Sequence, residues 1–194
     1  MNYVFDIGNV LLYFKPLPFL RSLWDDRELA ERLYENIFCS VEWRMLDEGS
    51  ITYDEATGWF CHRAPDDAAQ IRFVMRHWLR CMTPKWEMVE LLQEMKGQGK
   101  KLFYLSNMHS GAKEYLLGTY PFFKLFDGGM FSCDARMCKP DVRLYDAFCR
   151  EYGLEPASCL FTDDVRVNVQ GAEAVGMKGS LFVSAERFRD GLLL

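Results

Sequence analysis

The sequence lacks long apolar runs and clusters of positive charge. Its uncharged stretches in apolar regions, such as residues 115–123, are far short of the roughly 18 residues that a membrane span needs. No basic run exceeds two residues, and 23 Lys and Arg are outnumbered by 28 Asp and Glu, which gives a net charge of −5. Because phosphate backbones demand clustered Lys and Arg, we expect no membrane span and no nucleic acid as main partner.

An export signal and paired cysteines are also lacking. The first residues, MNYVFDIGN, do not show the basic and then apolar pattern of a signal peptide, so we expect a cytoplasmic protein. The seven cysteines are widely spaced without a C-x-x-C pair, which predicts reduced core residues. His62, His77 and His109 have no partner at metal-ligand spacing and are expected to be surface or half-buried residues.

The composition is that of a globular protein with a core. The chain has 194 residues, of which 49% are apolar and 26% charged. This length suits one domain, or one domain with a small insertion. We find no internal repeat, so the organisation must come from the order of strand-like and helix-like segments.

Short apolar runs predict a parallel sheet that is flanked by helices. The runs cover residues 3–5, 102–105, 159–161 and 181–183, with a weaker one at 130–132. Helical patterns lie between them: one starts at Thr83 and Pro84 and stops at Gly97 and Gly99, and others cover 141–152 and 166–175, each closed by a glycine.

Residues 15–82 show no strand-like run and are rich in helix formers and aromatic side chains. They predict an all-helical cap domain inserted after the first strand, so that residues 1–14 and 83–194 form the core. The alternative is one mixed domain without a separate cap.

Polar residues that suit phosphoryl transfer follow the predicted strands. Because parallel strands end at the same edge of a sheet, we expect these residues to meet there. They are Asp6, Ser106, Asn107, Lys139, Asp163, Asp164 and Asn168.

Each of these residue types has a chemical part to play. Two carboxylates from different strands can hold one Mg²⁺, a lysine neutralises phosphate charge, and a serine hydroxyl binds phosphate oxygens. A second aspartate is then free to attack phosphorus. Taken singly, the same residues have structural alternatives: Asp6 or the pair Asp163 and Asp164 as turn formers or helix caps, and Lys139 as an exposed lysine.

The order of these motifs resembles that of the haloacid dehalogenase (HAD) superfamily, in the subgroup with a helical cap. The first motif, D-I-G-N-V at residues 6–10, is similar to that of the branch that includes a bacterial α-glucose-1-phosphate phosphatase. The resemblance implies an α/β fold with a Rossmann-like three-layer core.

The resemblance also implies a role for each residue. Asp6 becomes the nucleophile, and Lys139 assists it. Ser106, Asn107 and Lys139 bind phosphate. Asp6, the Gly8 carbonyl and Asp164 hold Mg²⁺, with Asp163 and Asn168 as supporting residues.

The sequence departs from the common family pattern at Gly8. Most phosphatases of this family have a second Asp there, which protonates the leaving oxygen and later activates water. Three explanations stay open: a leaving group that departs easily, a proton donor from the cap, or weak catalysis. Within residues 41–49, VEWRMLDEG, Trp43 and Arg44 either face the site or belong to an ordinary helix with a solvated face.

These observations lead to a predicted function. We expect a Mg²⁺-dependent phosphatase that hydrolyses a small phosphorylated metabolite, with a sugar phosphate as one candidate, through an aspartyl-phosphate, as a monomer or homodimer. One alternative is a catalytically weak or inactive module that binds phosphorylated metabolites. A 2-haloacid dehalogenase is disfavoured, because displacement of halide from carbon needs no metal and hence no acidic pair.

Overall fold

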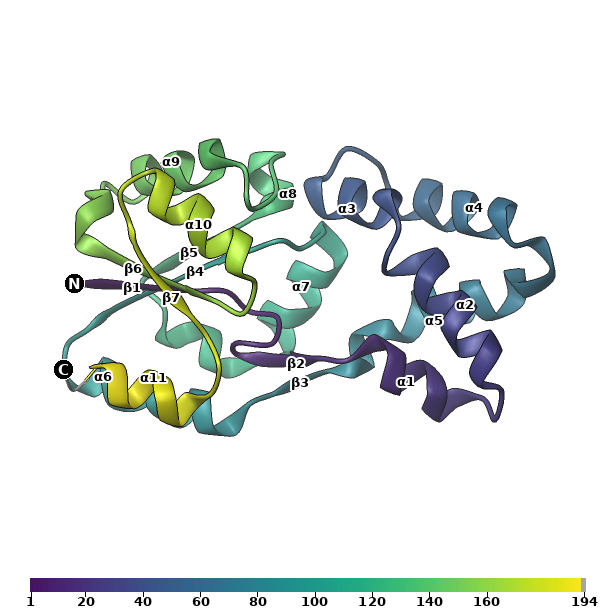
Figure 1. Ribbon diagram of the computed structural model, residues 1–194, viewed down its shortest axis with the longest axis horizontal. Helices are drawn as coiled ribbons and strands as arrows, with labels where there is room; N and C mark the ends of the chain where they lie inside the picture. The colour runs from purple at the N-terminus through teal and green to yellow at the C-terminus, as the bar shows by residue number, and fades with distance from the viewer. Residues whose placement is uncertain (193–194) are drawn as a thin grey trace.

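A computed structural model describes residues 1–192 and shows a five-stranded parallel sheet with helices on both faces (Figure 1). The strands lie in the order β5-β4-β1-β6-β7. Their bounds are β1 Asn2–Phe5, β4 Lys101–Ser106, β5 Gly128–Phe131, β6 Cys159–Asp163 and β7 Lys178–Leu181. The predicted three-layer Rossmann-like α/β fold is thus confirmed.

Side chains of the sheet alternate between two apolar layers, because successive residues of a strand point to opposite faces. On β1, Val4 packs in one layer with Phe148, whereas Phe5 lies in the other and meets Phe188 edge-on at 5.4 Å between ring centroids. Helices α9 and α10 cover the first face, and α6, α7 and α11 lie on the second (Figure 1). These helices are α6 Trp86–Gly97, α7 Ser110–Thr119, α9 Val142–Glu151, α10 Arg166–Ala174 and α11 Ala185–Leu192.

A second group of helices stands beside the sheet, on the right in Figure 1. It comprises α1 Pro16–Leu23, α2 Arg27–Ile37, α3 Val41–Glu48, α4 Tyr53–Arg63 and α5 Ala68–His77. An antiparallel ribbon of β2 (Leu12–Phe14) and β3 (Met82–Pro84) joins this group to the sheet. The predicted boundaries at 14 and 83 fall within this ribbon.

The remaining elements are short. They are the helix α8 Ser132–Ala135 and the 3₁₀ turns Pro65–Asp67, Trp78–Cys81, Pro121–Leu125 and Pro156–Ser158. None of the helices formed by residues 1–192 combines the length and apolar character that crossing a bilayer requires.

The helix ends follow the local chemistry of the sequence. Asp141 caps α9 by accepting a hydrogen bond from the Arg143 amide at 3.0 Å. Gly153 and Gly176 follow α9 and α10 with φ of 60° and 91°, the left-handed conformation that glycine adopts without strain.

Two predicted boundaries are wrong. Thr83 and Pro84 do not start a helix, because they pair with β2, and α6 begins only at Trp86. The last strand is Lys178–Leu181 rather than 181–183. Its register is set by the close approach of Gly179 to α10, where an added Cβ would lie 2.5 Å from Val169. Val183 remains 65% exposed, so its apolar character misled the prediction.

Two predicted environments are also wrong. All seven cysteines are free, as expected, but Cys39 is exposed rather than in the core. His109 is buried rather than half-buried. It caps α7, because its Nδ1 accepts a hydrogen bond from the Ala112 amide at 3.2 Å, and its ring packs against Trp43 and Trp78.

The His109 cap predicts a pH dependence of stability. Burial lowers the pKa of His109 from 6.5 to about 4, so the native state resists a proton that the unfolded chain accepts. This stabilisation is present above pH 6.5 and is lost as the pH falls toward 4, for a total of about 3 kcal/mol.

The measurement is urea unfolding of the wild type and of His109→Asn, which keeps a capping side chain, at several pH values. The difference between the two proteins isolates His109, because Asp6 and Asp47, whose pKa values are raised, contribute with the opposite sign in both. We expect the wild type to lose stability relative to the variant below pH 6.5. Parallel curves would contradict the assignment.

Candidate active site

The carboxyl ends of three adjacent strands bring the predicted site residues together. Asp6 follows β1, Ser106 ends β4, and Asp163 ends β6 and is followed by Asp164. A cavity of about 210 Å³ lies at this edge of the sheet. Its lining includes every predicted site residue except Asp163, which is fully buried behind it.

Lys139 lies at the centre of the site. Its Nζ is 2.7 Å from Asp6 Oδ1 and 2.6 Å from Asp163 Oδ2, and its side chain is 1% exposed. Burial alone would lower the pKa of Lys139, but the charges of Asp6 and Asp163 outweigh burial and raise it. The ammonium therefore stays charged inside the protein.

Asp163 holds this lysine and is itself fully hydrogen-bonded. Its Oδ1 accepts a hydrogen bond from the Val165 amide at 2.8 Å, and Asn168 Nδ2 donates to both carboxylate oxygens at 3.1 Å. The resemblance gave Asn168 a supporting role beside the metal ligands, and that role stays a prediction. In the structure the Asn168 amide supports Asp163.

Asn107 fixes the backbone of Lys139. Its Oδ1 accepts a hydrogen bond from the Lys139 amide at 2.8 Å, and its Nδ2 donates to the Lys139 carbonyl at 3.1 Å. This clamp between β4 and the lysine was not foreseen from the sequence. The predicted contact of Asn107 with phosphate stays a prediction.

The charges of the site suit a divalent cation. Asp6, Asp163 and Asp164 each offer an oxygen within 4.8 Å of the others, and Lys139 supplies one positive charge against these three carboxylates. Burial raises the pKa of Asp6 to about 6 and also raises the pKa of Asp164, and the charge of Asp163 adds to both shifts. Asp6 Oδ1 is buried and has no hydrogen bond of good geometry within residues 1–192. Oxygen ligands and excess negative charge are what Mg²⁺ requires.

Helix α3, the ribbon and the 3₁₀ turn Trp78–Cys81 contribute an apolar wall that the sequence did not predict as a unit. It consists of Phe14, Trp43, Trp78 and Met82. Trp43 both lines the cavity and packs against Phe38, so the two alternatives for this residue hold together, whereas Arg44 is exposed and does not line the cavity.

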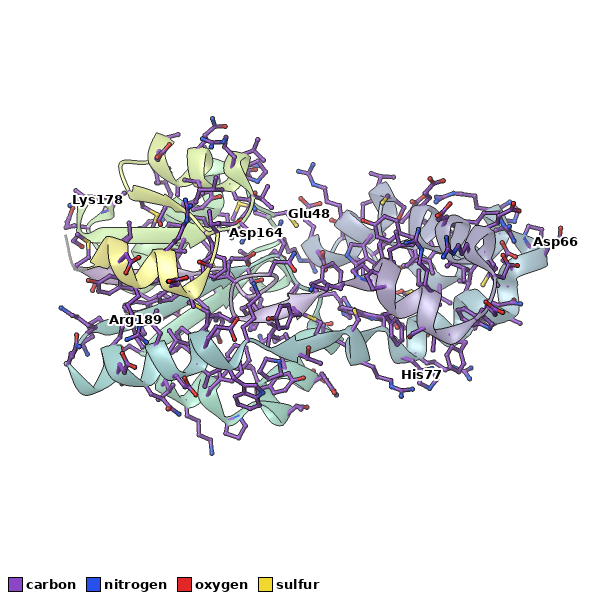
Figure 2. All side chains as sticks on the ribbon, turned by 60° about the horizontal axis from the view of Figure 1, so that its bottom comes forward. Glu48, Asp66, His77, Asp164, Lys178 and Arg189 are labelled. Carbon is purple, nitrogen blue, oxygen red and sulfur yellow. The ribbon has the colours of Figure 1, made fainter. Side chains whose placement is uncertain are left out.

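Further lining residues also went unpredicted. Asn9, whose φ of 54° is unusual for a residue other than glycine, lies in the same turn as Gly8. Asp47 follows Trp43 by one helical turn. The sequence pointed to Asp47 only as one of the polar residues that lie among aromatic residues in this segment. Figure 2 shows Asp164 and Glu48, the neighbour of Asp47, on either side of the junction between the sheet and the second helix group.

Comparisons with known proteins agree with this architecture. Residues 2–176 match the family of haloacid dehalogenase-like hydrolases. The sesquiterpene phosphatase astK of Aspergillus oryzae is 28% identical over 176 residues, which cover 91% of this chain and 86% of that protein.

Solved structures share the fold. A HAD family enzyme of Bacteroides thetaiotaomicron, BT-2542, solved with magnesium and inorganic phosphate, has a TM-score of 0.71 at 18% identity, with 93% of this chain and 92% of that chain covered. The L-2-haloacid dehalogenase of Xanthobacter autotrophicus has a TM-score of 0.71 at 17% identity, with 99% and 82% covered. At these identities the likeness establishes the fold alone.

The buried lysine predicts a large effect on stability. Lys139→Met keeps the length of the side chain but leaves Asp6 and Asp163 without their shared cation. We expect a loss of about 3–5 kcal/mol in the free energy of unfolding, measured by urea titration. The control is Lys113→Met, which removes the partly exposed ion pair with Asp134 and should cost at most about 1 kcal/mol. Equal effects in the two variants would contradict the central role of Lys139.

Proposed function

The chain belongs to the haloacid dehalogenase-like hydrolases, and on this basis we propose that it is a Mg²⁺-dependent phosphatase of small organic phosphate esters. The observation that carries the proposal is the meeting of Asp6, Lys139 and Asp164 at one cavity. A nucleophile, a phosphate-binding cation and a metal carboxylate are the parts that phosphoryl transfer needs.

In the proposed mechanism Asp6 attacks phosphorus in line and forms an aspartyl-phosphate, while the alcohol leaves. Lys139 and Ser106 hold the phosphate oxygens, because both line the cavity beside Asp6. Asp6, the Gly8 carbonyl and Asp164 would hold Mg²⁺, which neutralises charge on the nucleophile and on the phosphate. Water then hydrolyses the aspartyl-phosphate and regenerates Asp6.

The same geometry argues against the other two candidates. A dehalogenase needs no metal and therefore no carboxylate at position 164, yet Asp164 lines the cavity. A module that only binds phosphorylated ligands needs no buried nucleophile, yet Asp6 lies 2.7 Å from the ammonium of Lys139. The dehalogenase alternative does not explain Asp164, and the binding-module alternative does not explain Asp6.

The wall formed by Phe14, Trp43, Trp78 and Met82 bears on the substrate. We propose that residues 15–82 act as a cap, and that the organic part of the substrate contacts this wall. An apolar or aromatic group suits it better than a sugar, which would find few polar partners there. The naming of a similar fungal protein as a sesquiterpene phosphatase supports the same direction.

The first test is a panel of phosphate esters, with apolar, aromatic and sugar members, assayed for phosphate release with and without Mg²⁺. We expect Mg²⁺-dependent turnover, fastest for apolar esters. Asp6→Asn should lower kcat by at least about 10³, because an amide cannot attack phosphorus. Circular dichroism should show an unchanged fold. If Asp6→Asn released phosphate at the wild-type rate, the assignment of Asp6 as the nucleophile would be wrong.

The second test concerns the metal alone. A cation that binds only the folded state raises stability by about 2.7 kcal/mol at a hundredfold excess over its Kd, which is several degrees in Tm. We expect Mg²⁺ to raise the Tm of the wild type and of the control Asp146→Asn, an exposed carboxylate. The shift should vanish in Asp164→Asn. If Mg²⁺ raised the Tm of Asp164→Asn as much as that of the wild type, Asp164 would not be a metal ligand.

A further inference from the structure

The turn after β1 leaves the proposed phosphatase without an acid. Position 8 is a glycine, and a Cβ built there would meet no atom closer than Phe14 Cβ at 4.0 Å, so the place of a side chain is open space. A poor leaving group, such as an alkoxide, needs a proton as the bond to phosphorus breaks. That proton must come from another group that lines the cavity.

We propose that Asp47 of α3 is this acid, a catalytic residue that protonates the leaving oxygen. This inference rests on the proposed phosphatase function and deepens it. Among residues 1–192, three carboxylates line the cavity: Asp6, Asp47 and Asp164. Asp6 is assigned as the nucleophile and Asp164 as a metal ligand, so Asp47 is the one that remains.

The position of Asp47 suits the leaving group. Trp43 and Asp47 are four residues apart on α3, so they lie on the same face of the helix, and both line the cavity. The phosphate is expected at Ser106 and Lys139, on the sheet. The organic part of the ester then extends toward Trp43, which places the bridging oxygen near the carboxyl group of Asp47.

Contacts with the sheet domain hold Asp47 in place. Its carboxylate accepts a hydrogen bond from the His109 amide, and its carbonyl accepts one from Ser132 Oγ at 2.5 Å. Gly49 ends α3 with φ of 74° and lies against Cys133, where an added Cβ would be 3.2 Å from the carbonyl oxygen. This end of α3 is therefore fixed to α8, as a positioned acid requires.

The surroundings of Asp47 favour its protonated form. Three titratable groups interact electrostatically with Asp47. They are Asp6 after β1, Cys133 in α8 and Cys138 before α9. Within residues 1–192 no Lys or Arg forms an ion pair with it. Burial raises the pKa of Asp47 to about 7. The hydrogen bond from the His109 amide opposes this shift, and the charge of Asp6 adds a smaller contribution to it. A carboxyl group with this pKa is a proton donor near neutral pH.

The proton balance closes over the two steps. As an Asp6 oxygen bonds to phosphorus and the bond from phosphorus to the ester oxygen breaks, the Asp47 proton passes to that oxygen and the alcohol leaves. Water then attacks the aspartyl-phosphate and gives a proton to the Asp47 carboxylate. Asp6 and protonated Asp47 are thus restored, and phosphate departs.

The deciding experiment compares Asp47→Asn with the wild type on two esters. p-Nitrophenyl phosphate has a leaving group that needs little protonation, whereas benzyl phosphate has one that needs it. We expect the single-turnover rate of alcohol release to fall by about 10²–10⁴ for benzyl phosphate and by less than about tenfold for p-nitrophenyl phosphate. Single turnovers are used because the later hydrolysis of the aspartyl-phosphate is the same for both esters. The control is Glu48→Gln, the neighbouring carboxylate that does not line the cavity, and it should match the wild type.

Two further readouts separate acid catalysis from a structural role. Carboxyl NMR of the metal-free protein should show a group that titrates near pH 7 in the wild type and is missing from Asp47→Asn. Gly8→Asp combined with Asp47→Asn should regain turnover of benzyl phosphate, because a Cβ at position 8 meets no clash and the new carboxyl group would stand next to Asp6. A loss that persists in the double variant would assign the effect to structure and overturn the inference.

The remaining outcomes are also decisive. If the wild type hydrolyses both esters and Asp47→Asn slows the single-turnover release of both leaving groups equally, or of neither, the inference fails while the phosphatase proposal stands. If the wild type hydrolyses neither these esters nor any other, both fail together.

Discussion

The ion pairs of Lys139 with Asp6 and Asp163 are the interaction on which the rest of the site depends. They join the ends of β1 and β6 to the loop before α9 in a place that water hardly reaches. Burying an ion costs several kcal/mol, and only close partners with their own hydrogen bonds offset that cost. Here Asn168 and the Val165 amide satisfy Asp163, and Asn107 holds the lysine backbone. The surrounding residues therefore serve to keep one ammonium in one position.

The site draws its chemistry and its shape from different parts of the chain. The sheet domain supplies Asp6, Ser106 and Asp164 at the ends of strands, and Lys139 from the loop before α9. The ribbon and the helix group supply an apolar wall together with a single carboxylate. In the proposed phosphatase the polar half would bind the phosphate and the other half would select the ester, since function resides in the site rather than in the fold.

The sequence predicted that Asp6, Ser106 and Asp164 lie together at one edge of the sheet, because each of them follows or ends an apolar run that forms a strand. Asp6, Ser106 and Asp164 needed only the rule that parallel strands end at one edge. The other side could not be predicted in this way. Phe14, Trp78 and Met82 reach the cavity through tertiary packing, which leaves no local pattern. The pairing of Thr83 with β2 likewise overrode a typical helix start, because it depends on a partner about seventy residues away.

The ribbon of β2 and β3 is both the connection between the two halves and part of the cavity, since Phe14 and Met82 belong to it. A change in the angle between α1–α5 and the sheet would bend these paired strands and would therefore move Phe14 and Met82. If the angle between the halves varies, it is linked to occupancy of the cavity, because a molecule that fits between these side chains would favour one angle.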